Sequence, residues 1–506
     1  MHGILDEREV VCKNTLAAFE EVICTVRTGI DEEKRLDQVE RELMPLLMAV
    51  GKAALQDVVV ASGDGDAGKT VEIENRTLRR SPEKHCRAYR SIFGTLKISR
   101  YVYQLRAKTK VLHAPLDARL GLPADEVSYV LEDWLSRLSV NMPYASAAEF
   151  LSKTVCIPVQ ATTAENRVRK LGEHVESFYE ERRPPPIEDE QELLVCTADG
   201  KGVPIRRPLE QRLEEELGIK PHKRHRKNDY AKSARRTAVG DRNARTQRAT
   251  AGACYSIAPN RRSAEQMLAS EAEKKQGTGD DPRPVNKRLW AELTWIGEDG
   301  VSRGAERVFA ALAEEVAQRD PEGKRPLVCV MDGDRSLWKL QQEYLPRAVC
   351  IVDLFHVMDK LWKAAHCFHR ECSVEAEAFV TRYLRMLLEG NVDSVRGVFR
   401  RFLNQKQLTP AKRANLQEVI TYFKTNRQRM RYDQFLAAGY PIGSGVIEGA
   451  CKHIIGDRFC NSGMRWEIEG AQPLLDLRVT RLNQEWEPFI QYRIQTEQNN
   501  LYQQAA

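Results

Sequence analysis

The stretch from Pro326 to Trp362, PLVCVMDGDRSLWKLQQEYLPRAVCIVDLFHVMDKLW, decides the fold. Two apolar runs of strand length, LVCVM and AVCIV, stop at Asp332 and Asp353, and a helix-compatible segment joins them. Near-continuous apolar runs that alternate with a helix predict neighbouring parallel strands buried on both faces. Carboxylates at the carboxyl ends of such strands lie where open α/β sheets place their active sites. The pattern therefore predicts a metal site, with a plain helix N-cap as the alternative for either aspartate taken alone.

The residues before this stretch complete the predicted sheet and add a third aspartate. The segment LLVCTADGKGVPIRRP holds an apolar strand that ends at Asp199, and two further strands are predicted over 249–259 and 288–297. Apolar residues over 305–320 recur at helical spacing, so a helix leads into the strand before Asp332. The predicted elements follow one another as three strands, a helix, a strand, a helix and a strand. This is the order of an α/β core of the RNase H-like type. In that fold the first and fourth strands are neighbours, so we expect Asp199 and Asp332 to converge.

The chain after His356 changes character twice. Apolar residues keep a helical spacing and no strand pattern appears, which predicts an all-helical insertion over 357–440. GYPIGSGVIEGACKHIIGDRF then begins with a Gly/Ser turn. Ser444 is predicted to cap a helix that carries Glu448 one turn in, with Lys452 on a neighbouring face.

The N-terminal part is predicted to be mainly helical. Two helices between about 6 and 54 and a strand over 95–103 precede three helices over 125–140, 144–154 and 161–175. The tight connection between the last two suits a helix-turn-helix whose later helix enters a DNA major groove, and three-helix packing without a DNA role is equally open. The candidate contacts on that helix are Thr162, Thr163, Asn166, Arg167, Arg169 and Lys170.

The proline-rich and acidic segment RRPPPIEDEQE marks the clearest domain boundary. The predicted domains are an N-terminal region over 1–115, the helix-turn-helix over 116–181, and a linker over 182–192. An RNase H-like core over 193–356 and 441–486 surrounds the insertion over 357–440, and a tail covers 487–506.

Composition and charge favour a soluble, cytoplasmic DNA-binding protein. Charged residues make up 30% of the 506 residues, and no apolar run approaches the roughly 18 residues of a membrane span, so we expect no membrane partner. The twelve cysteines form no CxxC pair, as in a protein with reduced thiols. Basic residues crowd between 218 and 248. Such blocks are usually solvated or disordered faces, and where they contact nucleic acid the affinity is driven by phosphate and sensitive to salt. The candidate contacts there are Lys223, Arg224, Arg226, Lys227, Arg235 and Arg236.

Two other motifs are weaker. Gly63 to Thr70 spells a literal phosphate-loop pattern, but Asp64 and Asp66 would place negative charge in the phosphate nest and a strand-like run follows, so we expect no nucleotide. The cluster His366, Cys367, His369 and Cys372 has zinc-ligand types, but four ligands so close on one helix cannot easily face one ion.

The motifs are specific in combination. TADGKGVPIRRP around Asp199, VMDGDRSLW around Asp332, VDLFHV with Asp353 and His356, GSGVIEGACKHIIGDRF around Glu448 and SGMRW at Trp466 together resemble bacterial insertion-sequence transposases of the DDE, RNase H-like class. The resemblance is closest to the ISKra type, with ISL-type and Mutator-type relatives.

This resemblance implies site residues and partners. Asp199, Asp332 and Glu448 would form the catalytic, metal-binding triad, and Asp353 with His356 an accessory pair. Apart from the resemblance, Lys452, Arg458 and Trp466 are candidate DNA contacts; Trp466 would stack on a displaced base, and a packing role for this tryptophan is at least as open. The protein would act on terminal inverted repeats and target DNA in a bacterial nucleoid, as a dimer or higher oligomer because two ends must be held together.

The triad also suits the chemistry. Cleavage and joining of DNA strands need two Mg²⁺ ions, or Mn²⁺ as a substitute, roughly 3.5 to 4 Å apart. Asp199 would bridge both ions, while Asp332 and Glu448 would bind one each. His356 is predicted to be a neutral orienting group, since magnesium disfavours imidazole. The alternatives are a structure-selective nuclease and a domesticated DNA-binding protein with an inactive core.

Overall fold

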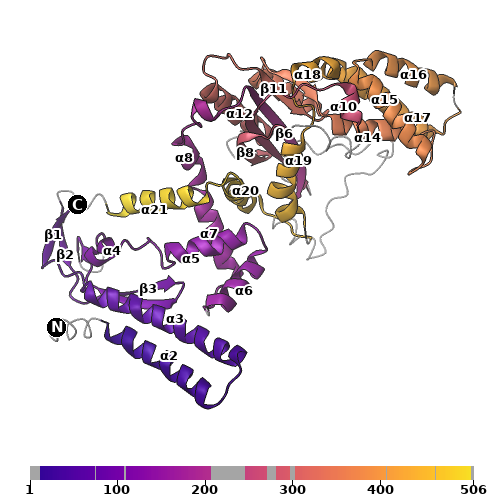
Figure 1. The fold of residues 1–506 in the computed structure, drawn as a ribbon. Coiled ribbons are helices and arrows are strands. Elements are labelled where there is room, and N and C mark those ends of the chain that lie inside the picture. The colour runs from indigo at the N-terminus through magenta and orange to yellow at the C-terminus, as the bar shows by residue number, and fades with distance from the viewer. Residues whose placement is uncertain are drawn as a thin grey trace, which may run out of the picture. The chain divides into compact units, whose positions relative to one another are not determined.

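The computed structural model describes residues 12–73, 76–106, 110–155, 157–206, 246–269, 281–296, 302–405, 407–461 and 463–502. The chain forms two compact units (Figure 1). The first comprises Met1–Glu180 and Gln484–Ala506, and the second comprises Glu181–Asn483. The predicted linker begins at this boundary. The last segment, predicted as a tail, belongs instead to the first unit as helix α21 (Trp486–Tyr502).

A five-stranded mixed sheet forms the centre of the second unit, with the strand order β12-β11-β6-β7-β8. The strands β6, β7 and β8 form an antiparallel meander, and β11 and β12 run parallel to β6. The predicted neighbours β6 and β11 are thus confirmed. The strands are β6 (Leu193–Pro204), β7 (Thr246–Ile257), β8 (Val285–Leu293), β11 (Leu327–Met331) and β12 (Val349–Val352), beside a short hairpin of β9 (Trp295–Ile296) and β10 (Ser302–Arg303).

Helices cover both faces of this sheet. Helix α12 (Ala305–Arg319) packs on β7, where a Cβ added to Gly252 would stand 2.5 Å from Val308. Only glycine permits that close approach. Helix α19 (Gly445–Cys451) packs on β6 and β7, and α20 (Ile468–Leu482) packs on β8. The remaining helical segments of this layer are α10 (Ala264–Leu268), α13 (Arg335–Tyr344), the 3-10 turn η1 (Ile187–Asp189) and the π-helix η3 (Lys452–Cys460).

The predicted insertion is helical throughout its described residues. Aromatic rings of Phe379, Tyr383 and Phe399 pack against one another in its core, which merges with the core under the sheet. Its elements are α14 (Leu354–Ala365), α15 (Val374–Leu388), α16 (Val392–Gln405), α17 (Pro410–Asn426), the 3-10 turn η2 (Arg427–Arg429) and α18 (Tyr432–Ala438).

The first unit combines a helical hairpin, small sheets and a helical cluster. Its helices are α2 (Lys13–Asp31), α3 (Leu36–Ala61), α4 (Pro115–Arg119), α5 (Tyr129–Ser139), α6 (Tyr144–Val155), α7 (Ala161–Gly172), α8 (Val175–Glu180) and α21. Its strands are β1 (Thr70–Ile73), β2 (Arg76–Arg80), β3 (His85–Ser91), β4 (Gly94–Arg100) and β5 (Tyr103–Gln104). The phosphate-loop pattern leads into strand β1 rather than into a helix, as predicted.

Helix α3 is more apolar than the sequence analysis allowed. Among the described residues it is the one helix with the length and hydropathy of a membrane span, with a mean of 1.6 over eighteen residues. That evidence is weak, because the same window contains Lys52 and Asp57. The Asp57 carboxylate accepts hydrogen bonds from Asn14 and Thr15 of α2, so a charged group ties the two helices together.

Candidate functional site

The register of the sheet places Asp199, Asp332 and Asp353 at equivalent positions along three neighbouring parallel strands. Cys329 on β11 pairs with Cys196 on β6, and Asp332 and Asp199 each lie three residues farther along. Met331 pairs with Val352 on β12, so Asp332 and Asp353 each follow directly. Parallel neighbours lie about 4.8 Å apart, and the three acids therefore stand side by side across β6, β11 and β12. The predicted convergence of Asp199 and Asp332 is confirmed, since each lies within the other's electrostatic influence.

Asp199 lies inside its strand, which corrects the prediction that the strand ends there. β6 continues to Pro204 and stays paired with β7 along its whole length. Asp199 is opposite Ala251, and alternate side chains along β7 point to opposite faces, so Asp199 faces away from α12, against which Gly252 packs. On its own face it accepts a hydrogen bond from the thiol of Cys451 on α19, and burial together with this carboxylate raises the pKa of Cys451.

Asp332 is a half-buried carboxylate among other acids. Its Oδ1 accepts the backbone N–H of Asp334 at 2.8 Å, and the Trp338 indole donates to its carbonyl at 2.7 Å. Burial raises the pKa of Asp332, and the charges of Asp334 and Asp199 raise it further. In the described part of the chain, no lysine or arginine forms an ion pair with it. Asp332 therefore stands among acids, and the charge of His356 opposes their effect on its pKa.

Asp353 is fully buried and satisfied by three donors. Its Oδ2 accepts the backbone N–H of His356 at 3.1 Å and contacts the ring Nδ1 at 2.7 Å, so it does cap α14. Its Oδ1 accepts the backbone N–H of Ser444 at 2.8 Å. One buried carboxylate thus joins the start of α14 to the start of α19.

His356 carries a positive charge in this arrangement. The hydrogen bond to Asp353 raises the pKa of His356 to about 9, with further contributions from the charges of Asp353, Asp332 and Glu448, against the opposing effect of burial. At neutral pH the ring is therefore protonated in the metal-free protein, whereas the sequence analysis expects a neutral histidine beside bound Mg²⁺. An imidazolium has no lone pair for a metal, so in this state His356 orients and balances carboxylates.

Glu448 reaches the row of aspartates from α19. Its Oε1 lies 4.0 Å from His356 Nδ1 and accepts the hydroxyl of Ser444 at 3.3 Å. Ser444 occupies the N-cap position, but its side chain bonds Glu448 rather than the backbone predicted for a cap. Among the described residues, Asp353, His356 and Glu448 are the one group of three metal-ligand types whose atoms all lie within 4.8 Å. The sequence cluster around His366 and Cys367 does not converge in this way.

The donor set fits divalent cations that prefer oxygen. Asp199, Asp332 and Glu448 offer carboxylate oxygens, as Mg²⁺ and Mn²⁺ require. The pKa of Asp332 is raised because burial and the neighbouring acids outweigh the charge of His356, so a bound cation would be favoured there. These three residues would hold the ions, as the sequence analysis expects.

Two basic residues beside the site were missed by the sequence analysis. Lys201 lies two positions after Asp199, hence on the same face, and is exposed. Its Nζ is 3.0 Å from where a Cβ on Gly456 would stand, so the glycine of the π-helix leaves it room. On the opposite face, Arg248 crosses Gly200 and pairs with Asp334 at 2.5 Å. The alternating glycines of the DGKG sequence, Gly200 and Gly202, were the sequence signal that could have pointed to space for long side chains at this place.

Two predicted DNA contacts prove to be buried packing residues. Arg458 is 1% exposed and lies over the ring of Trp466 at 4.7 Å. Trp466 is buried and its indole donates to the Phe459 carbonyl. Contacts of these side chains with DNA are therefore contradicted, while Lys452 is exposed as predicted.

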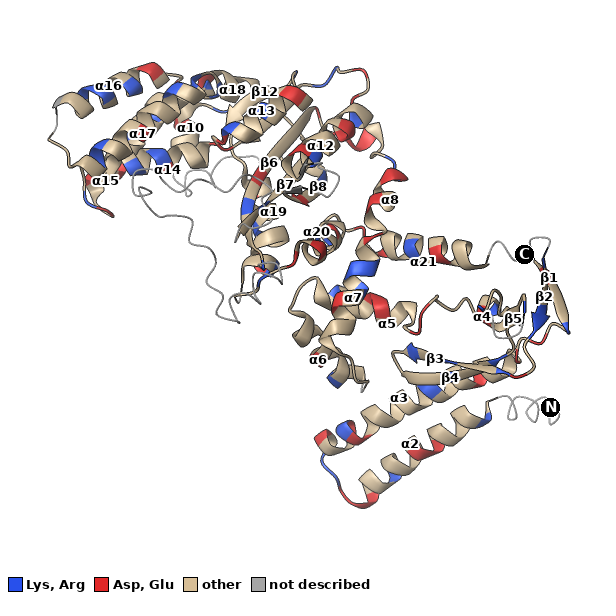
Figure 2. Ribbon diagram, turned by 180° about the vertical axis from the view of Figure 1, so that it is seen from behind, with Lys and Arg blue, Asp and Glu red and all other residues tan. Residues whose placement is uncertain are grey.

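Of the predicted DNA contacts on helix α7, some are engaged in ion pairs or half-buried and others are exposed. Helix α7 carries both acidic and basic residues (Figure 2). Arg167 pairs with Asp125 and with Glu132 at 3.5 Å, which commits it to the interior and contradicts a free DNA contact. Arg169 pairs with Glu165 at 2.9 Å, and Thr163 is half-buried. The exposed members share one face at intervals of four and are Thr162, Asn166 and Lys170.

The six candidate contacts from the basic segment lie outside the described residues. They are Lys223, Arg224, Arg226, Lys227, Arg235 and Arg236. The described cysteines are free thiols, five of them buried and four exposed.

No protein-family model matches the chain, and a search of curated proteins finds no match either. The grounds for a function are therefore the strand order, the row of aspartates, Glu448 with its protonated histidine, and the sequence resemblance.

Proposed function

We propose that the second unit is an RNase H-like catalytic core and that the chain is a metal-dependent DNA transposase of the insertion-sequence type. The order β12-β11-β6-β7-β8, with a three-stranded meander and two added parallel strands, supports this fold. The observation that carries the proposal is the alignment of Asp199, Asp332 and Asp353 across three neighbouring strands, with Glu448 supplied by α19. The sequence resemblance favours a transposase among the enzymes with such a core.

Each residue has a definite part in the proposed reaction. Two Mg²⁺ ions, or Mn²⁺, would activate a water or a 3′-hydroxyl and offset charge on the leaving oxygen. Asp199, Asp332 and Glu448 would hold these ions through carboxylate oxygens. Asp353 orients His356, whose charged ring holds Glu448 in place.

The scissile phosphate needs positive charge at the open side of the carboxylates. Lys201 projects from the face of β6 that carries Asp199 and is exposed. We assign it a phosphate contact, because an ammonium group there balances charge without competing for the metal.

DNA recognition is proposed for the exposed face of α7 and for the basic segment over 218–248. Two transposon ends must meet for joining, so the active form is a dimer or higher oligomer.

The test uses duplexes copied from the DNA that flanks the gene. In Mg²⁺ the wild-type protein should cut them and join a 3′-hydroxyl end to a second duplex, whereas Asp199→Asn, Asp332→Asn and Glu448→Gln should bind the same DNA without cutting. Asp359→Asn, an exposed acid on α14 outside the carboxylate group, is the matched control and should remain active. Cutting without joining would assign a nuclease instead. Full cutting by any of the three variants would remove that residue from the site.

A further inference from the structure

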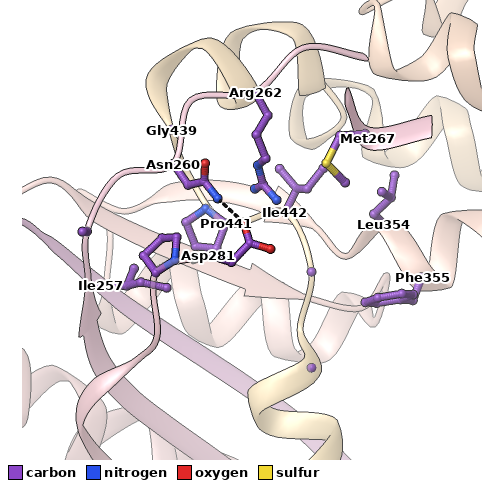
Figure 3. Close-up of a pocket in the computed structure, with 14 residues that line it drawn as sticks. Ile257, Asn260, Arg262, Met267, Asp281, Leu354, Phe355, Gly439, Pro441 and Ile442 are labelled. Atoms are coloured by element: carbon purple, nitrogen blue, oxygen red, sulfur yellow. Dashed lines mark hydrogen bonds between the residues drawn. The ribbon is translucent and has the colours of Figure 1, made fainter. Parts of the chain in front are cut away.

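A pocket of about 290 Å³ adjoins the carboxylates in the second unit (Figure 3). Its walls come from the segment after β7, the start of α14 and the segment over 439–445. Asn260 and Asp281 lie together at one side, Leu354 and Phe355 at the other, with Arg262 between them (Figure 3). The volume is near the lower end of pockets that bind small molecules.

The pocket and the candidate metal site share a border. A Cβ on Gly443 would stand 3.1 Å from the ring of Phe355 and 3.9 Å from Asp353 Oδ1. Phe355 itself lies between Asp353 and His356 in the sequence. A group bound in the pocket is therefore adjacent to whatever is held at the carboxylates.

The lining combines apolar walls with hydrogen-bonding groups at one side. Ile257, Met267 and Ile442 are apolar, and the ring of Phe355 is 53% exposed. Asn260 donates to Asp281 at 2.8 Å. Arg262 is half-buried, its Nε has no hydrogen-bond partner, and burial lowers its pKa while Asp281 raises it.

These features select one kind of ligand. A free phosphate is disfavoured because the Asp281 carboxylate shares the polar side with Arg262. A planar heteroaromatic ring suits the site, because its faces meet apolar side chains and its edge meets donors and an acceptor, as in pockets for extrahelical bases.

We propose that this pocket binds an unstacked base of the DNA strand whose phosphate lies at the carboxylates. The inference rests on the proposed function and adds a specific ligand site to it.

The test places 2-aminopurine, which brightens when unstacked, at single positions around the bond that the wild-type protein cuts. The full chain carrying Glu448→Gln should bind this DNA uncut and raise the fluorescence at one position. Adding Phe355→Ala or Arg262→Gln, which alter opposite sides of the pocket, should abolish the rise. In the otherwise wild-type chain, each should slow cutting at limiting DNA about tenfold. Val374→Ala, an exposed apolar residue at the start of α15, should change neither signal.

Two results would overturn the inference and leave the function intact: no rise at any position while the wild-type protein cuts the same DNA, or a rise that survives both pocket variants. If the wild-type protein neither binds nor cuts the DNA, the proposed function fails and this inference fails with it.

A second and independent observation concerns helix α2 of the first unit. Five large apolar side chains on it are exposed and follow one another at intervals of three and four, the spacing of a coiled-coil seam. They are Leu16, Phe19, Ile23, Val26 and Ile30. A different face of α2 already contacts α3, since a Cβ on Gly29 would stand 3.0 Å from Val39.

Charge complementarity indicates what covers this seam. An antiparallel copy of α2 centred on Ile23 brings Leu16 opposite Ile30. In the same arrangement Glu20 of each copy lies beside Arg27 of the other copy. Both residues are exposed. We infer that α2 pairs with α2 of a second copy of the chain, independently of any activity.

The mass of the full chain in solution tests this pairing. The wild-type chain should form a dimer, Ile23→Asp and Arg27→Glu should shift it to monomer, and Glu20→Arg with Arg27→Glu should restore the dimer. Leu47→Asp, an exposed leucine of α3, is the control and should remain dimeric. A monomeric wild-type chain, or a dimer that persists in Ile23→Asp, would overturn the inference.

Discussion

Two regions of the molecule bury carboxylates in opposite ways. In the first unit, buried Asp117 is held by Arg87 at 2.9 Å and by Arg100 at 2.7 Å. In the second unit, half-buried Asp332 has the acids Asp199 and Asp334 as charged neighbours, and the opposing charge of His356 does not outweigh burial and these acids. The first arrangement is neutralised within the chain and serves stability. The second retains negative charge, as sites for external cations do.

Replacing Asp332, the acid without a lysine or arginine partner, should have the largest effect. It should change the rate of DNA cutting but not the stability of the fold. Asp332→Asn should reduce DNA cutting about a thousandfold or more. It should leave the melting temperature equal or higher, because burial and neighbouring acids already disfavour the charged form. Cutting rates and thermal unfolding of the same preparation measure both. A large fall in stability would place Asp332 with the structural acids.

Replacing Asp117, the acid paired with two arginines, should instead lower the stability of the first unit. Asp117→Asn leaves two arginines without their carboxylate and should cost about 3–5 kcal/mol of the free energy of unfolding of the first unit. Asp37→Asn, on the exposed pair with Arg35, is the control and should cost about 0–1 kcal/mol. Denaturant titration distinguishes them, and equal effects would contradict the comparison.

The pair of Arg248 with Asp334 provides a smaller test beside the site. A Cβ on Gly200 would stand 2.0 Å from Arg248 Nε, so Gly200→Ala should displace the guanidinium and cost about 1–3 kcal/mol. Gly397→Ala on α16 meets no atom within 4 Å and should be neutral or stabilise by up to about 1 kcal/mol. Denaturant titration of the two variants checks this, and an unaffected Gly200→Ala would show that the arginine is not held there.

A separate expected effect is a pH dependence of the stability that comes from His356. Its pKa is raised to about 9 in the folded, metal-free protein against about 6.5 when unfolded. The resulting stabilisation is complete below about pH 6.5 and is lost as the pH rises through about 9. Titration of the histidine ring by NMR, with His356→Gln to assign its signal, should show the raised pKa. A value at or below 6.5 would contradict the charged ring.

The position of Asp332 and Asp353 could be predicted from sequence, because the strands before them are continuous apolar runs with abrupt ends, whereas the ion pairs of Asp117 were not predicted. The full length of β6 could not, since KGVP resembles a loop until β7 pairs with it. Arg458 was misjudged because the π-helix carries no regular apolar period, and Trp466 because its burial depends on a bridge to distant Ile205.

Two other features could not be predicted, because they depend on residues far apart in the sequence. The charge on His356 depends on carboxylates brought together by folding. The docking of α21 depends on Glu132, which pairs with Arg493 far along the chain.

The central claim is that the unmatched carboxylates hold divalent cations, and Mn²⁺ binding followed by electron paramagnetic resonance tests it most directly. The wild-type chain should bind about two ions, Asp332→Asn should bind fewer with its stability retained, and the exposed control Asp359→Asn should match the wild type. Unchanged Mn²⁺ binding in Asp332→Asn would contradict the account.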